Sequence, residues 1–275
     1  MNNLVSICVP AYNDSAYIKD TINSFLNQTY QNIEVIVVDD VSQDDTYEVL
    51  KEIKDSRLKV YKNEVNLGMG ANWNKCISHA NGEFIKLLGA DDMLMPNAIE
   101  LEVSAFLTNP SVILVESDTL LMDSTGKKIG VQKRYHNSGL NNGKSLAKKY
   151  LIGNNRFGAA GANMFRKSSF EKYGEFDTNF LNMIDFEFFL RLACHGDIYI
   201  IREVLNGFRL ANDSNQTQVL GKDKEKTKDY YNTHKRILNK YKDVLNISNL
   251  ECMISLVHRN VWSFAAAMYL KIVLK

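Results

Sequence analysis

The alternation of short apolar runs with helical patterns over residues 4–117 is the feature that most restricts the fold of this chain. Runs rich in Val, Ile and Leu predict strands at 4–10, 33–40, 57–61, 83–88 and 111–117. Helical spacing of apolar residues lies between them, near 16–26, from about 44, near 70–79 and near 97–107. Nearly continuous apolar strands suit a parallel sheet buried on both faces, and the alternation indicates βαβ units. The sequence therefore predicts an α/β fold with a mostly parallel central sheet flanked by helices.

The pattern changes after residue 117. Turns and shorter runs fill 118–155, a second set of elements follows, and a charged segment leads into the end of the sequence. With no internal repeat and no low-complexity linker, one sheet with added elements is favoured over two independent domains. We predict one domain over 1–215, with halves at 4–117 and 118–215, and a helical extension over 216–275.

Charge and cysteine content limit the classes of partner. Lys and Arg number 33 against 32 Asp and Glu, which gives a net charge of +1 and no field that favours nucleic acid. The four cysteines form no CxxC pair, so a metal or disulfide framework is not expected. The start of the sequence has no signal-peptide pattern. We expect a cytoplasmic protein that binds a small molecule and no nucleic acid.

The stretch 261–275, VWSFAAAMYLKIVLK, is apolar with lysines near its end. It is too short to span a bilayer as a helix. A helix packed on the core is the simpler interpretation, and an amphipathic helix on a membrane surface is the alternative. Peripheral membrane contact through this tail therefore stays open.

Polar residues follow three of the predicted strands. They are Pro10-Ala11-Tyr12-Asn13, Asp39-Asp40 and Asp91-Asp92. Ligands of parallel α/β sheets bind outside the carboxyl ends of the strands, so these groups are expected to line one cleft. Singly, Tyr12 could pack in the core, and the aspartates, Asp44 among them, could cap the next helix. Together, a flat aromatic ring, a hydrogen-bonding carboxylate and an acidic pair suit a nucleotide.

The acidic pair also suits a cation. Mg²⁺ or Mn²⁺ takes oxygen ligands, usually one or two carboxylates with substrate phosphates and water. Such an ion would relieve the repulsion between Asp91 and Asp92. No P-loop is present, and the glycines of NLGMGANWN lack the spacing of a dinucleotide motif. The phosphates are therefore expected to rest on a metal ion, with Asp92 as its ligand.

Three segments, taken in order, resemble glycosyltransferase family 2, whose members have the GT-A fold and use nucleotide-sugar donors. They are VSICVPAYNDSAYIKDTINSFLNQTYQNIEVIVVDDVSQDDT, NLGMGANWNKCISHANGEFIKLLGADDMLMP and GANMFRKSSFEKYGEFD. The likeness runs from about residue 4 to 215. It implies that Pro10, Ala11 and Tyr12 line the base pocket and that Asp39 contacts the uracil. It also implies that Asp91 and Asp92 form the metal motif, with Asp92 the nearer ligand.

The segment MIDFEFFLRLACHG resembles the EDxxLxxRL segment of the family. The resemblance places Asp185 at the position of the catalytic base in an inverting transfer. The structural alternative for Asp185 is a helix N-cap. Glu187 is explained by a pair with Arg191 one helical turn later, and His195 by capping at the end of the helix.

Glycosyl transfer from such a donor needs one base for the acceptor hydroxyl, because a metal ion can absorb the charge of the departing diphosphate. The resemblance therefore implies a metal-dependent inverting glycosyltransferase. The expected donor is a UDP-sugar, and the expected acceptor is a glycan or glycolipid of surface polysaccharide or glycolipid synthesis. The 4–117 half would bind the nucleotide and the 118–215 half the acceptor.

The chain departs from the family pattern at four places. Val41 replaces a frequent Gly, Gly89 replaces a frequent Asp, and Ile184 replaces the Glu before the base. The late RxH pattern becomes Arg209-Leu210-Ala211, so a His contact to the diphosphate is missing.

Three other interpretations were weighed. A non-catalytic nucleotide-sugar-binding protein fits the missing His. A phosphoacceptor receiver would share VIVVDD and DDMLMP, but it leaves about 150 residues and Asp185 without a role. A nucleotidyltransferase would need a Gly-rich loop with basic residues after the first strand, where this chain has VPAYNDSAY.

Overall fold

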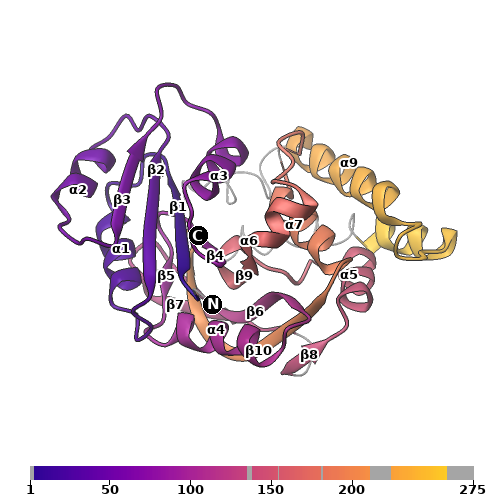
Figure 1. Ribbon diagram of the computed structural model, residues 1–275. Helices are drawn as coiled ribbons and strands as arrows, with labels where there is room; N and C mark the ends of the chain where they lie inside the picture. The colour runs from indigo at the N-terminus through magenta and orange to yellow at the C-terminus, as the bar shows by residue number, and fades with distance from the viewer. Residues whose placement is uncertain (1–2, 135–137, 154, 181, 211–223, 259–275) are drawn as a thin grey trace.

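A computed structural model describes residues 3–134, 138–153, 155–180, 182–210 and 224–258 (Figure 1). The stretch 261–275, for which a packed or membrane-bound helix was predicted, lies outside these ranges. The predicted strands and helices of the first half are confirmed, with ends that differ by a few residues. They are β1 Val5–Ala11, α1 Ile18–Leu26, β2 Ile33–Asp39, α2 Thr46–Glu52, β3 Leu58–Lys62, α3 Met69–Ser78, β4 Phe84–Leu87, α4 Ala98–Thr108 and β6 Val112–Met122. The short strand β5 Met93–Leu94 was not predicted.

The second half adds shorter elements. They are β7 Lys128–Gln132, β8 Gly139–Asn141, α5 Gly143–Ile152, η1 Ala160–Ala162, β9 Asn163–Arg166, α6 Lys167–Tyr173, α7 Ile184–Ala193, β10 Asp197–Arg209 and α9 Lys224–Tyr241. A further helix covers 249–258.

All of these strands join one sheet of order β3-β2-β1-β4-β9-β6-β10-β5, with β7 on β6 and β8 on β10. Strands β3, β2, β1 and β4 run parallel, as their apolar sequences predicted. The antiparallel members, β9, β5, β7 and β8, pair with β4, β6 or β10. The α/β class with a mostly parallel central sheet is thus confirmed.

Helices cover both faces of this sheet (Figure 1). One core layer packs α1 and α4 against the sheet through residues such as Ile22, Phe25 and Phe106. The other packs α3, α5, α7 and α9 against it and is rich in phenylalanine. Because the central strands β1, β2 and β4 are buried along nearly their whole length, their ends are where polar side chains reach solvent.

The segment after the acidic pair differs from the sequence prediction. Asp91 and Asp92 precede the short strand β5, and helix α4 begins only at Ala98. The helix-cap interpretation of Asp92 is therefore wrong. Among the described residues, no helix is both long and apolar enough to cross a membrane.

Candidate active site

Strands β1 and β2 bring the first group of predicted residues together. Ala11 lies opposite Asp39 in the parallel register, and Pro10 lies one residue before. The Asp40 N–H donates to the carbonyl of Ala11 over 2.8 Å, so β1 and β2 stay paired up to their carboxyl ends. Tyr12 follows at once and is 47% exposed, so it does not pack in the core. The strand ends thus present an accessible aromatic ring beside Asp39.

Asp39 is fully buried at this edge. Its Oδ2 accepts the N–H of Ser42 over 3.3 Å and lies 3.8 Å from the Lys62 ammonium. Its Oδ1 has no hydrogen-bond partner among the residues that the structure describes. A buried carboxylate oxygen without a donor is costly, so this atom is suited to receive an N–H from a ligand.

Asp40, in contrast, has a structural role. Its Oδ1 accepts from the side chain of Asn63 and the N–H of Leu67, and its Oδ2 accepts the N–H of Gly68. These bonds fix the 63–68 loop that leads into α3. Asp40 therefore does not cap α2. Asp44 does bind the start of α2, where it accepts from both the N–H and the hydroxyl of Thr46.

Val41, the first departure from the family pattern, has a backbone φ of 63°. This left-handed conformation disfavours β-branched side chains and favours glycine. Bonds from the neighbouring loop hold the turn in place: Asn13 N–H donates to Ser42 Oγ, and Gln43 N–H donates to Asn13 Oδ1. The glycine that many members have here would be the less strained residue.

The acidic pair lies at the carboxyl end of β4, next to β1 in the sheet. Asp92 is buried, and within the described part of the chain its two oxygens accept the N–H groups of Gly89 and Arg209 alone, over 3.2 and 3.3 Å. Burial and then the charge of Asp91 raise the pKa of Asp92 to about 8. Burial also raises the pKa of Asp91. This pair carries more negative charge than its protein donors balance.

Gly89 and Gly161 make room for the pair. A Cβ on Gly89 would lie 2.8 Å from Asp91 Oδ1 and 3.1 Å from Asp92 Oδ2, so a side chain there would displace the carboxylates. A Cβ on Gly161, in η1, would lie 3.6 Å from Asp92 Oδ2 and 2.9 Å from the Leu88 side chain. The frequent Asp at position 89 is therefore incompatible with this arrangement of the pair.

Arg209 holds the acidic pair from the end of β10. Besides its N–H bond to Asp92, its Nε donates to the carbonyl of Asp91 over 2.9 Å. Its Nη1 donates to the carbonyls of Asp123 and Ser124. The charge of Arg209 lowers the pKa of both aspartates, although burial outweighs it. The sequence showed Arg209 only as the remainder of an incomplete RxH pattern.

Asp14 adds a further carboxylate that sequence reasoning missed. Burial, and then the charges of Asp91, Asp44 and Asp39, raise its pKa to about 7. Its Oδ2 accepts the N–H of Tyr12 over 3.0 Å, which fixes the turn after β1. The β1, β2 and β4 loops thus bring acidic groups close enough to interact, a setting that favours a cation.

The donor set fits a divalent ion that shares its coordination with a ligand. No group of three or more His, Cys, Asp or Glu that could hold a metal occurs in the described part of the chain. Proteins usually supply one or two carboxylate ligands to Mg²⁺, and substrate phosphates and water complete its coordination. Two adjacent carboxylates with unfilled acceptor sites match this pattern. Asp91 and Asp92 therefore fit as a partial site.

Asp185 lies in the first turn of α7, and the residue at the N-cap is Met183, with φ 59°. The N-cap interpretation of Asp185 is therefore wrong. Its Oδ1 accepts the N–H of Phe186 over 2.8 Å. Burial raises the pKa of Asp185 to about 6, so the carboxylate is ionised at neutral pH and still basic enough to accept a proton.

Ile184, which replaces the family's Glu, packs the start of α7 against α3. A Cβ added to Gly70 of α3 would lie 2.5 Å from the Ile184 side chain. Since the 63–68 loop fixed by Asp40 leads directly into α3, the two halves of the domain touch here. The hydrophobic contact replaces an acidic group beside the predicted base.

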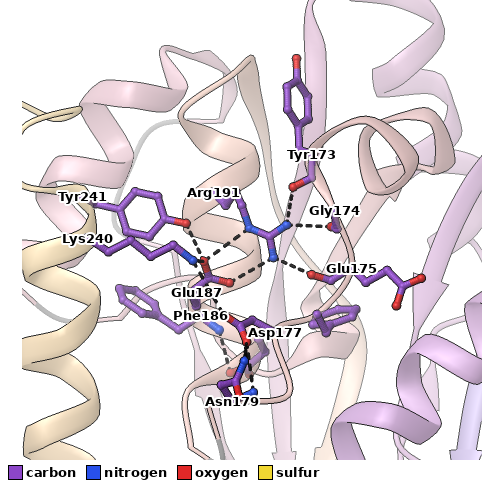
Figure 2. Close-up of polar contacts among 12 residues, drawn as sticks. Tyr173, Gly174, Glu175, Asp177, Asn179, Phe186, Glu187, Arg191, Lys240 and Tyr241 are labelled. Carbon is purple, nitrogen blue, oxygen red and sulfur yellow. Dashed lines mark hydrogen bonds and ion pairs between the residues drawn. The ribbon is translucent and has the colours of Figure 1, made fainter.

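Figure 2 shows how the rest of α7 is held. Glu187 is fully buried and accepts from Arg191 over 3.1 Å, Lys240 over 2.8 Å and Tyr241 over 2.5 Å. The predicted pair with Arg191 is thus confirmed, and α9 adds two further donors. Arg191 also donates to the carbonyls of residues 173–175, the turn after α6. Side chains of α7 and α9 and the backbone carbonyls of 173–175 therefore fix the helix that carries Asp185.

His195 does not cap α7. The C-cap is Cys194, and the His195 ring stacks on Tyr173, with ring centroids 4.0 Å apart and an interplanar angle of 4°. Burial lowers the pKa of His195. This ring therefore joins α7 to the end of α6.

The family model of glycosyl transferase family 2 matches residues 6–174. The chain therefore belongs to this family, and it is a glycosyltransferase. The interpretations as a receiver or a nucleotidyltransferase are set aside by this assignment.

Two curated relatives show the range of similarity. The first is the UDP-Glc:alpha-D-GlcNAc-diphosphoundecaprenol beta-1,3-glucosyltransferase WfgD of Escherichia coli. It is 36% identical over 141 residues, which cover 50% of this chain and 56% of that enzyme. An uncharacterized glycosyltransferase of Methanocaldococcus jannaschii is 29% identical over 226 residues, which cover 80% and 76%.

Among solved structures, S. aureus TarS 1–349 in complex with UDP-GlcNAc matches with a TM-score of 0.69 at 18% identity. The match covers 88% of this chain and 67% of that chain. At this identity the likeness shows the fold alone, and the GT-A fold is confirmed.

Proposed function

We propose that this glycosyltransferase moves a sugar from a UDP-sugar to an acceptor hydroxyl by a metal-dependent inverting reaction. The observation that carries the proposal is the buried Asp39 Oδ1 without a donor, at the same sheet edge as Asp91 and Asp92. Among the described residues, one end of this edge leaves a carboxylate oxygen without an N–H donor, and at the other the charge of Arg209 is outweighed by the burial of two adjacent carboxylates. A uracil with its diphosphate and a cation would supply both the N–H donor and the positive charge.

The uracil base fits the β1–β2 end of this edge. Its ring N–H would satisfy Asp39 Oδ1, and its flat face would stack on the exposed ring of Tyr12. Pro10 and Ala11 would form the floor between them. The names of the relatives support a uridine donor, since WfgD is described as using UDP-Glc and TarS binds UDP-GlcNAc.

Asp91 and Asp92 would hold Mg²⁺ or Mn²⁺, with Asp92 as the main ligand. When bound, the ion supplies Lewis-acid stabilisation of the negative charge on the departing diphosphate. Arg209 and Gly89 contribute by fixing the orientation of the pair. Since no histidine follows Arg209 in an RxH pattern, the diphosphate lacks the His contact that many members have and depends more on the ion.

Asp185 would act as the base. It would take the proton of the acceptor hydroxyl as the oxygen attacks the anomeric carbon from the face opposite the diphosphate. The bond to the diphosphate breaks as the new bond forms, so the configuration of the anomeric carbon is inverted. A carboxylate with a pKa near 6 is ionised at pH 7 and suits this step. The acceptor would be a glycan or glycolipid of surface polysaccharide or glycolipid synthesis, bound on the 118–215 side, and the reaction would take place in the cytoplasm.

Calorimetry of UDP binding, with and without Mn²⁺, tests the donor site. The native chain should bind UDP more tightly with Mn²⁺, and Asp92→Ala should lose that gain while Asp20→Ala, an exposed aspartate of α1, keeps it. Asp39→Asn should weaken UDP binding with or without the ion. Equal binding by the native chain and Asp92→Ala in Mn²⁺ would contradict the metal site.

A further inference from the structure

The helix at 249–258 exposes an apolar stripe. Leu250, Met253, Ile254 and Val257 are 67%, 65%, 51% and 62% exposed. Their spacing of three, four and seven residues places all four on one face of the helix. Exposed apolar side chains that stand alone need no explanation, but a contiguous stripe marks an interaction surface.

The opposite face of this helix is firmly held. Ser255 Oγ donates to the carbonyl of Leu151 in α5 over 2.8 Å and lies 2.8 Å from His234 Nε2 in α9. Cys252 and Leu256 pack against the phenylalanine-rich core layer. The docked face leaves the stripe pointing outward.

The start of the helix is also fixed. Ser248 and Glu251 form a capping box, in which each backbone N–H donates to the side chain of the other. Glu251 also pairs with Lys148 of α5 over 3.0 Å. The one acidic group of the helix is thus neutralised.

Positive charge accompanies the stripe. Lys148 also donates to the carbonyl of Asn246, so α5 lies beside the 246–251 segment. Helix α5 contains Lys144, Lys148 and Lys149 and no acidic residue, and Lys144 and Lys149 are exposed. The sequence continues from the helix through 259–275 with Arg259, Lys271 and Lys275, Trp262 and Tyr269, and no Asp or Glu.

We propose that this face is a docking surface for an anionic lipid membrane. Its apolar side chains would enter the boundary between headgroups and acyl chains, and the lysines of α5 would meet the headgroups. A rigid stripe with basic neighbours and an acid-free, apolar continuation fits a lipid surface. A protein partner that buried the same stripe would not require the lysines of the neighbouring helix α5.

Vesicle cosedimentation of the full chain tests this surface. Vesicles of phosphatidylcholine alone are compared with vesicles that contain phosphatidylglycerol, at low and at high salt. We expect binding only to the anionic vesicles, weakened by salt. The double variant Ile254→Gln/Val257→Gln should reduce that binding at least about tenfold, because each loses the transfer energy of a large aliphatic side chain.

The matched control is Leu107→Gln/Ile129→Gln, two aliphatic residues that are 47% and 45% exposed on α4 and β7. It should bind vesicles as the native chain does. Vesicle binding that is absent, or equal in both double variants, overturns the proposal. Light scattering that shows a native dimer and a monomeric Ile254→Gln/Val257→Gln variant would instead assign the stripe to a second copy. A lowered unfolding temperature of that variant without vesicle binding would assign it to residues 259–275.

Discussion

The two carboxylate groups proposed for the reaction are held in place by different means. Asp39, Asp91 and Asp92 follow parallel strands, and backbone N–H groups and glycines within a few residues shape their surroundings. Asp185 lies on a helix that is fixed by side chains of α9 and of the helix itself, and by backbone carbonyls at the end of α6. Strand order and bonds from Arg209 of β10 therefore form the donor edge, whereas the base depends on an ion-pair cluster between helices α7 and α9.

Removing the base tests most directly whether the donor edge and the base act separately. Asp185→Asn should lower kcat about 10²- to 10⁴-fold, because the acceptor proton then has no carboxylate to receive it. The dissociation constant for UDP with Mn²⁺, measured by calorimetry, should stay within about twofold of the native value. A comparable loss of UDP binding would mean that Asp185 also contributes to donor binding.

The side-chain support of α7 gives the second largest effect. Glu187→Gln should lower the free energy of unfolding by about 3 kcal/mol, since it leaves Arg191 and Lys240 without their buried counter-charge. Urea titration followed by circular dichroism measures this change. Glu171→Gln removes an exposed pair with Lys167 on α6 and should change the same quantity by less than about 0.5 kcal/mol.

The pH dependence of turnover tests the role of Asp185 separately from the donor edge. Asp185 acts as an acceptor of protons only when ionised, and its pKa is raised to about 6. At saturating donor and Mn²⁺, kcat should therefore fall about tenfold per pH unit well below pH 6 and level off above it. A profile of initial rates from pH 4.5 to 8 checks this. A plateau that continues below pH 5 would exclude Asp185 as the titrating group.

The smallest effect concerns the backbone of the donor edge. The left-handed backbone of Val41 costs the folded state about 1–2 kcal/mol, and Val41→Gly removes this strain. Glycine in turn loses about 0.5–1 kcal/mol more backbone entropy on folding. The net gain in unfolding free energy should be below about 1 kcal/mol. Val49→Gly in α2, where the backbone is helical, should instead lose about 1 kcal/mol. A loss in both variants would show that the Val41 turn carries no strain.

The sequence predicted the first half of the fold because its signals are local. Apolar runs such as VIVV mark β2, and the polar residues directly after such runs mark the sheet edge. Glu187 could be paired with Arg191 from spacing alone, but its bonds to Lys240 and Tyr241 link residues more than fifty positions apart. No local pattern encodes such a contact. The strand after Asp92 was missed because two residues are too few for a period.

Other features of the site could not be recognised from the sequence because they depend on burial and on how distant segments pack. Asp14 appeared as one of several polar residues in a turn, and only its burial shows that it belongs with the acidic loops. Gly161 opens GANMFRKSSFEKYGEFD, one of the segments that resemble the family, but its closeness to Asp92 depends on how η1 meets β4.

The bond between Asp92 and Arg209 has a consequence for the order of folding on the ribosome. Residues 4–117 leave the ribosome first and contain every carboxylate of the donor edge. The strand that pairs with β5 and donates to Asp92 is synthesised 117 residues later. A nascent chain can therefore assemble β1 to β4 early, yet its acidic pair acquires its final partner only when β10 joins the sheet.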